Sequence, residues 1–180
     1  MRSRGIWNQR HVFLLMSILL LGVLTLTAWL WMDHAWQEEA HGRAGGKLMT
    51  YARDYLSEAR RLLQAAEEGG DAAALDLAIL DVVVAERLVD VLRDLDPQRY
   101  EQWAQVKDWL GAEVYSRLRD LALKPWDDAE RETLAEVGFL MELLAGIFPE
   151  EGEEAWNRIE NVHLQQKLQA VEEYLTRPGG

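Results

Sequence analysis

The longest apolar run of the chain covers residues 12–32, which are 21 residues without a charged side chain. Because a helix rises about 1.5 Å per residue, about 20 apolar residues cross the hydrocarbon core of a bilayer, which is about 30 Å thick. A helix on the surface of a globular domain needs a polar face. This run has none, since its polar side chains are small hydroxyls that bond to the helix backbone. The pattern predicts a transmembrane helix over residues 12–32.

A cleaved signal peptide is the alternative, because Arg2, Arg4 and Arg10 precede the run as the positive region of a signal does. The apolar core of a signal is usually only about 7 to 15 residues long. Cleavage sites with two small residues are also poor here, since Asp33 lies two positions before Ala35. We therefore favour a permanent anchor.

The charges on the two sides of the run differ and predict its orientation. Arginines precede it, whereas Asp33, Glu38 and Glu39 follow it. Because basic flanks stay on the cytoplasmic side, we expect a cytoplasmic tail over residues 1–11 and an extracytoplasmic domain after the span. Tryptophan and arginine at the ends of a span are typical membrane-interface anchors. The predicted anchors are Trp7 and Arg10 at the inner interface and Trp29, Trp31 and Trp36 at the outer one.

Residues 33–46 are predicted to form a juxtamembrane linker, because Gly42, Gly45 and Gly46 are expected to interrupt the helix. In residues 47–180 apolar positions recur every three or four residues, and no stretch shows the two-residue alternation of a strand. Five helical blocks are separated by short connections, which force neighbouring helices to be antiparallel. The chain is therefore predicted to be all-α, with one transmembrane helix followed by an up-and-down bundle of four to five helices.

Turn and capping residues mark the ends of these blocks. In chain order they are Gly69-Gly70, Asp71 as a cap, Leu95, Asp96-Pro97 as a cap and first-turn proline, Lys124-Pro125, Asp127 with Glu130 as a capping box, and Gly146 with Pro149. The second block is the most apolar, and each of the other four has one apolar stripe. The stripes are Leu48, Ala52, Tyr55, Ala59, Leu62 and Ala66; Tyr100, Trp103, Val106, Leu110, Val114, Leu118 and Leu121; Leu134, Val137, Leu140, Met141 and Leu144; and Trp156, Ile159, Leu164, Leu168, Val171 and Leu175.

The charge balance excludes one class of partner. All 31 acidic residues but only 16 of the 19 basic ones lie from Asp33 onward, which gives this part a net charge of −15. Such a surface repels nucleic acid, so we expect no nucleic-acid partner.

The chain has no cysteine, hence no disulfide, thiolate zinc site or thiol nucleophile. It also has no N-x-S/T glycosylation site, and we favour a bacterial cell envelope.

Two charged residues lie on apolar helix faces. Asp81 lies among leucines and valines of the second block, and Arg117 shares the apolar face of the third block with Leu110 and Leu121. An unpaired carboxylate in a core is costly, so either Asp81 has a partner or that face of the helix is not buried. Counted from the Asp96-Pro97 turn, the two residues differ in level by about 7 Å. The pattern predicts a buried ion pair that fixes helix register, with a ligand or proton-handling site as the alternative.

Trp109 lies about 130° from the centre of the third stripe. Such a tryptophan is either covered by another helix or exposed as an interface anchor. The first interpretation is favoured, and Trp109 is retained as a candidate partner contact.

Two histidine patterns have the spacing of metal ligands. His34, Glu38 and His41 follow at helical intervals, and Glu160 with His163 has the Glu-x-x-His spacing of di-metal bundles. Those sites also need inward glutamates from two other helices, which the order of these motifs does not supply. We therefore predict no metal or other cofactor, and a hydrogen-bonded core position for His163.

No nucleophile motif, glycine-rich phosphate loop or calcium loop occurs in the sequence, so no enzyme is predicted. We expect a membrane-tethered, extracytoplasmic interaction module that is an accessory or scaffold subunit of a cell-envelope complex. The alternative is a ligand- or metal-binding sensor subunit. Its contacts would be the membrane, through one helix, and a protein partner, and a homo-oligomer is left open.

Overall fold

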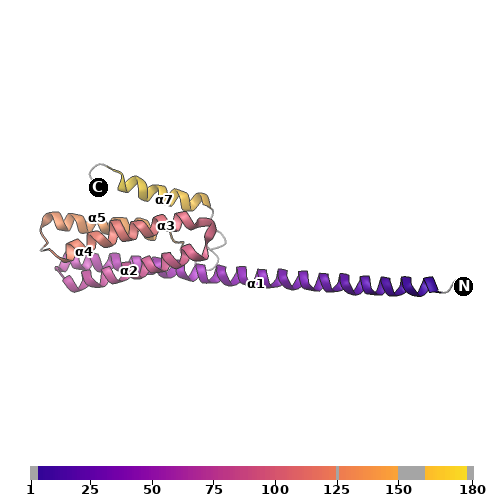
Figure 1. The fold of residues 1–180 in the computed structure, drawn as a ribbon. Coiled ribbons are helices and arrows are strands. Elements are labelled where there is room, and N and C mark those ends of the chain that lie inside the picture. The colour runs from indigo at the N-terminus through magenta and orange to yellow at the C-terminus, as the bar shows by residue number, and fades with distance from the viewer. Residues whose placement is uncertain (1–3, 125, 150–160, 178–180) are drawn as a thin grey trace. The chain divides into compact units, whose positions relative to one another are not determined.

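The computed structural model of the protein describes residues 4–124, 126–149 and 161–177, with side chains described from residue 23 onward apart from residues 34, 35, 37, 38, 161 and 162. All regular elements in these ranges are helical, which confirms the all-α prediction (Figure 1). The elements are α1 (Arg4–Gly69), α2 (Ala72–Leu95), the 3₁₀-helix η1 (Pro97–Arg99), α3 (Tyr100–Asp108), the π-helix η2 (Trp109–Tyr115), α4 (Ser116–Ala122), α5 (Asp128–Ala145) and α7 (Asn161–Leu175).

The chain divides into two compact units, Met1–His41 and Gly42–Gly180, and α1 continues through the division. In the first unit the threonine hydroxyl of Thr27 donates to the backbone carbonyls of Val23 and Leu24, at 2.9 and 3.0 Å. This polar side chain is therefore satisfied by its own helix, as expected. The large apolar side chains described in this unit are all exposed, and they are Val23, Leu24, Leu26, Trp29, Leu30, Trp31, Met32 and Trp36.

The structure describes the side chains of only part of the predicted membrane span. Where side chains are described, no helix combines the length and the apolarity that crossing a membrane requires. Of residues 12–32, the side chains of residues 12–22 lie outside the described ones, as do those of Trp7 and Arg10.

The predicted interruption of the helix at the glycines is wrong. The backbone remains helical through Gly42, Gly45 and Gly46. Each glycine in a helix costs about 1 kcal/mol relative to alanine. All three glycines are buried, however, and packing of a helix face outweighs intrinsic propensity.

The core stripe of α1 differs from the predicted one at alternate positions. Ala52, Ala59 and Ala66 are buried as predicted, but Leu48 and Leu62 lie only partly buried at the flank. The exposed ring of Tyr55 lies on the same flank. The bulky core residues are Met49, Leu56 and Leu63 instead. Both sets have helical spacing around the shared alanines, so the pattern alone does not decide between them.

The predicted N-caps of α2 and α5 are confirmed. The Asp71 carboxylate accepts a hydrogen bond from the backbone N–H of Ala73, at 2.9 Å. The Asp127 carboxylate accepts from the backbone N–H groups of Ala129 and Glu130, at 2.8 and 3.2 Å. These bonds satisfy N–H groups that have no partner within the helix. Both helices begin directly after the predicted cap.

The third block is one continuous helical rod with a π-helical centre, η2. Its predicted stripe is buried at every position except Tyr100. From Val106 to Leu118 the stripe repeats every four residues three times, which in an α-helix drifts by about 120°. In η2 the backbone N–H of Ser116 bonds to the carbonyl of Gly111, an i→i+5 bond that widens the turn. The wider turn keeps all these side chains on the core side.

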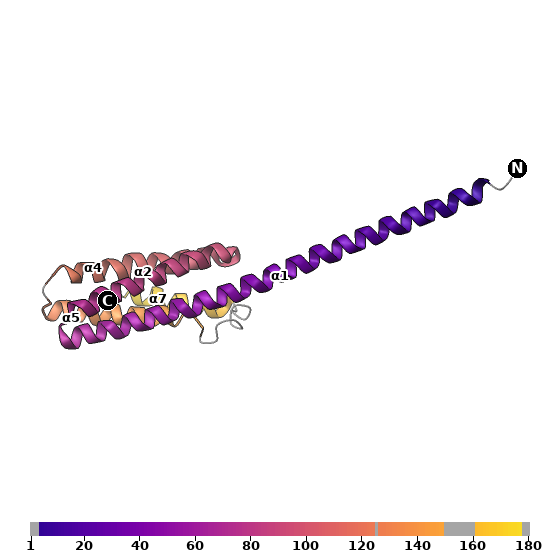
Figure 2. The same ribbon diagram turned by 90° about the horizontal axis from the view of Figure 1, so that it is seen from below.

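The helices of the second unit form a bundle around a single core. The rod of α3, η2 and α4 packs against α2 on one side and α5 on another (Figure 2). The predicted α5 stripe is buried at all five positions. α7 packs against α5 and α3, and its Leu164, Leu168 and Val171 are buried. Trp156 and Ile159 of the last predicted stripe lie outside the described residues.

Candidate functional site

α2 carries two apolar stripes, and only one of them faces the core. At about 100° per residue, Leu77, Leu80, Val84, Leu88 and Val91 fall within an arc of about 80°, centred about 130° from the core stripe. Leu77, Leu80 and Val91 are 52, 56 and 47% exposed. Leucine and valine at this exposure and spacing form a continuous apolar surface along α2.

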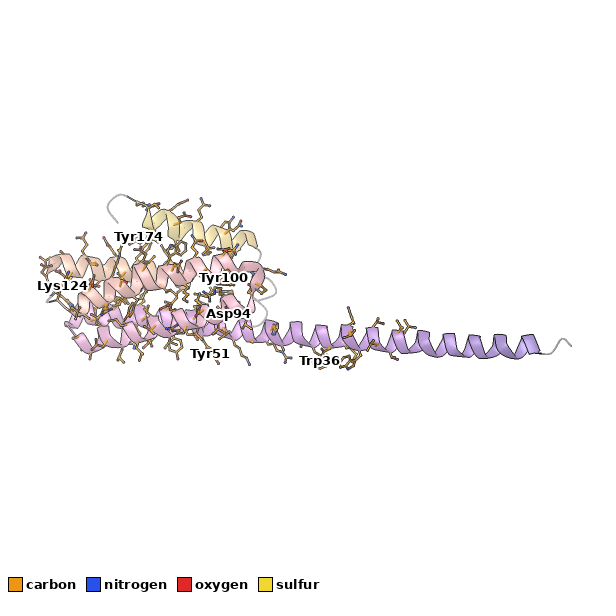
Figure 3. The ribbon with its side chains drawn as sticks, viewed as in Figure 1. Trp36, Tyr51, Asp94, Tyr100, Lys124 and Tyr174 are labelled. Atoms are coloured by element: carbon orange, nitrogen blue, oxygen red, sulfur yellow. The ribbon has the colours of Figure 1, made fainter. Side chains whose placement is uncertain are left out.

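The neighbouring surface of α1 supplies two tyrosines. Tyr51, which points away from the core, and Tyr55 border a shallow hollow of about 260 Å³ between α1 and α2 (Figure 3). Its other lining residues are the carboxylates Asp54, Glu58 and Asp81, and none is basic. We call this surface the α1–α2 face, made of Tyr51, Asp54, Tyr55, Glu58, Leu77, Leu80, Asp81, Val84, Leu88 and Val91.

Asp81 lies in the hollow between α1 and the apolar stripe of α2, and no basic residue lines that hollow. Burial, and then the nearby Glu58 carboxylate, raise the pKa of Asp81 above its ordinary value. Glu58 itself accepts two hydrogen bonds from Arg61, at 2.6 and 2.8 Å, which lower its pKa. Within the described part of the chain, Asp81 forms no hydrogen bond or ion pair. The face therefore combines apolar surface with one incompletely solvated carboxylate.

The predicted ion pair between Asp81 and Arg117 does not form. The Arg117 guanidinium contacts the carboxylates of Glu113, at 3.3 Å, and Glu136 on α5, at 3.6 Å. Asp81 faces α1 instead. Counting residues from the turn compares only the levels of the two side chains along their helices. It does not show which side of α2 faces the rod of α3, η2 and α4. That side is marked by Asp90, whose carboxylate accepts a hydrogen bond from Lys107 at 2.8 Å.

The turn between α2 and α3 is held by a buried carboxylate that the sequence assigned to another role. Asp96, 5% exposed, accepts a hydrogen bond from the indole N–H of the fully buried Trp103, at 3.0 Å, and pairs with Arg99, at 2.6 Å. Trp103 in turn stacks on Phe148, with ring centroids 6.1 Å apart. Asp96 is the N-cap residue of η1 and Pro97 lies in its first turn, as predicted, but the Asp96 side chain makes no cap bond to η1. The available signal was an aspartate seven residues before a core tryptophan.

The remaining candidate residues lie apart from the α1–α2 face. Trp109 is partly buried and packs against the core, as the favoured interpretation predicted. His163 is exposed, so its predicted core position is wrong, and His41 is also exposed. No group of three or more His, Cys, Asp or Glu side chains among the described residues is placed to hold a metal ion. The side chains of His34, Glu38 and Glu160 lie outside the described residues.

Comparison of the chain with protein-family models, curated proteins and solved structures finds no match.

Proposed function

We propose that this chain is a non-enzymatic, membrane-tethered interaction module, an accessory or scaffold subunit of a bacterial cell-envelope complex. Residues 12–32 form its anchor, the N-terminus is cytoplasmic, and the helical bundle lies outside the membrane and binds a protein partner.

The observation that carries the tether is the exposure of the apolar side chains of α1 in residues 23–36. These side chains point to all sides of the helix, and residues 23–32 contain no charge. Contiguous exposed apolar surface of this kind marks a membrane or protein contact. Trp29 and Trp31 lie at the C-terminal end of the run and are followed by Asp33. This arrangement is typical of the extracytoplasmic interface between a membrane and water.

The α1–α2 face supports the interaction role. It is a second apolar surface, and its Leu77 and Leu80 are exposed outside the core that the other stripe of α2 helps to form.

Alkaline carbonate extraction of membranes that contain the full chain tests the tether. The chain is expected to stay in the membrane pellet. Val23→Arg places a charge near the middle of the span, which costs about 3 kcal/mol on insertion scales, and should move much of the chain to the soluble fraction. Val23→Leu is the control and should remain in the pellet. Complete extraction of the unaltered chain would contradict the tether.

A photocrosslinking amino acid at position 80 tests the interaction role in native membranes. It is expected to give a discrete protein adduct. The control is the same amino acid at the exposed Arg119 position on α4, which should give none. Identical adduct patterns from both positions would contradict a role for the α1–α2 face.

A further inference from the structure

We infer that the α1–α2 face docks an amphipathic helix of a partner protein whose apolar stripe carries a single arginine or lysine placed against Asp81. This inference rests on the proposed interaction function and specifies the chemistry of the partner.

The apolar part of the face has the dimensions of a helix-docking site. Leu77 and Val91 are 14 residue steps apart, or about 21 Å at 1.5 Å per residue. This length matches about four turns of a bound helix. Helix-in-groove recognition uses apolar anchors at intervals of three and four residues, and the α2 stripe repeats at these intervals. Tyr51 and Tyr55 form the opposite border, and aromatic rings are frequent interface anchors.

The Asp81 carboxylate determines which charge a bound helix should carry. A wholly apolar helix laid over Asp81 would remove an unpaired carboxylate from water, which is costly. A guanidinium or ammonium group at that position forms charge-assisted hydrogen bonds with Asp81 instead. Asp54 adds negative charge, whereas Glu58 is already paired with Arg61, and the faces of the two tyrosine rings also favour a cation.

The same charges disfavour the two other occupants of such a face. In a symmetric dimer the same patch meets itself, so the carboxylates of Asp54 and Asp81 would face their own copies. Anionic lipid headgroups would meet the same repulsion. A cationic helix is the occupant that complements both the apolar and the acidic parts of the surface.

Two labelled peptides test the inference on the full chain in detergent micelles. Both are 18-residue helices of zero net charge outside the test position, with a leucine stripe. One has arginine at the centre of the stripe, and the other has citrulline, which is neutral and has the same shape. Binding is measured by fluorescence anisotropy at physiological salt. The arginine peptide is expected to bind about tenfold more tightly.

Two variants assign this difference to one carboxylate. Asp81→Asn should bring the two dissociation constants within about twofold of each other, as expected when one charge-assisted contact is lost. The control, Asp76→Asn, removes an exposed carboxylate of α2 outside the face and should keep the tenfold ratio. Leu80→Gln should weaken both peptides, because it removes apolar contact.

Equal binding of the two peptides, no binding of the arginine peptide, or a ratio that survives Asp81→Asn would overturn the inference. Because the chain has no cysteine, Leu80→Cys introduces its only thiol. Rapid disulfide dimerisation of this variant, beyond that of the exposed control Leu123→Cys, would show a second copy on the face and also overturn it. A position-80 adduct in native membranes combined with equal peptide binding would leave the proposed function standing without its cationic partner.

Discussion

Replacing Asp96 by alanine should destabilise the bundle by about 3 kcal/mol. The change removes the hydrogen bond from Trp103 to a buried charge, which contributes about 1.5 to 3 kcal/mol, together with the ion pair to Arg99. It also leaves the indole N–H of Trp103, whose side chain is fully buried, without its acceptor. The estimate stays at the lower end because the Arg99 side chain is 12% exposed and can regain contact with water. For a domain of this size, about 3 kcal/mol corresponds to a fall in Tm of about 6 to 12 °C.

Thermal unfolding of the full chain in micelles, followed by far-UV circular dichroism, measures this effect. Asp94→Ala is the matched control, since its side chain is 71% exposed and contacts Arg93 only at 3.5 Å, and it should change stability by less than about 0.5 kcal/mol. A double-mutant cycle with Trp103→Phe should give a coupling free energy of about 1 kcal/mol. If Asp96→Ala and Asp94→Ala had equal effects, or if the cycle were additive, the buried hydrogen bond would not stabilise the turn as described.

Of three further substitutions, two should lower the stability of the fold and one should raise it. Gly70→Ala should destabilise by about 1 kcal/mol because φ is +65° there, whereas Gly69→Ala, in equally open space but with ordinary helical backbone, should not, and chemical denaturation of both compares them. Trp109→Ala should destabilise by about 2 kcal/mol, because its ring packs against the core, and an unchanged Tm would return it to the role of a partner contact. Asp81→Asn should stabilise at neutral pH. Burial raises the pKa of Asp81 in the folded chain, so the folded chain binds the proton more tightly than the unfolded chain does. The ionised carboxylate therefore lowers the free energy of unfolding as the pH rises above the ordinary pKa of aspartate. The gain should vanish below about pH 4, and a gain of equal size at pH 3 and pH 7 would contradict this.

Sequence alone predicted the elements whose ends have a local chemical cause. Asp71 and Asp127 bond to backbone N–H groups within the next three residues, so their role does not depend on distant parts of the chain. The five buried stripe positions of α5 were also predicted, although Phe139 and Leu143 of the same helix lie outside the stripe.

The errors share a different cause, which is competition between two local solutions that only tertiary packing decides. In α1 two leucine-rich flanks border the same alanine seam, and the core selected Met49, Leu56 and Leu63. The buried glycines were assigned to a linker because their propensity, not their burial, is visible in sequence. Asp96 was assigned as a cap although its acceptor capacity serves Trp103.

The candidate site was only partly predictable. The sequence identified Asp81 as anomalous, because it interrupts an apolar stripe. The second stripe on α2 was then treated as core, since a helix apolar on two faces gives no sign of which face is covered. Its partner on α1, the Tyr51–Tyr55 border, became visible only when α1 and α2 were placed side by side.

Labelling of single cysteines in intact cells tests the central claim, a single anchor with the bundle outside the membrane, most directly. Leu123→Cys lies at a side chain that is 77% exposed on the bundle, and Ser3→Cys lies in the predicted cytoplasmic tail. A membrane-impermeant maleimide should label Leu123→Cys in intact cells, and it should label Ser3→Cys only after the membrane is permeabilised. Labelling of both cysteines in intact cells, or protection of Leu123→Cys, would contradict the account.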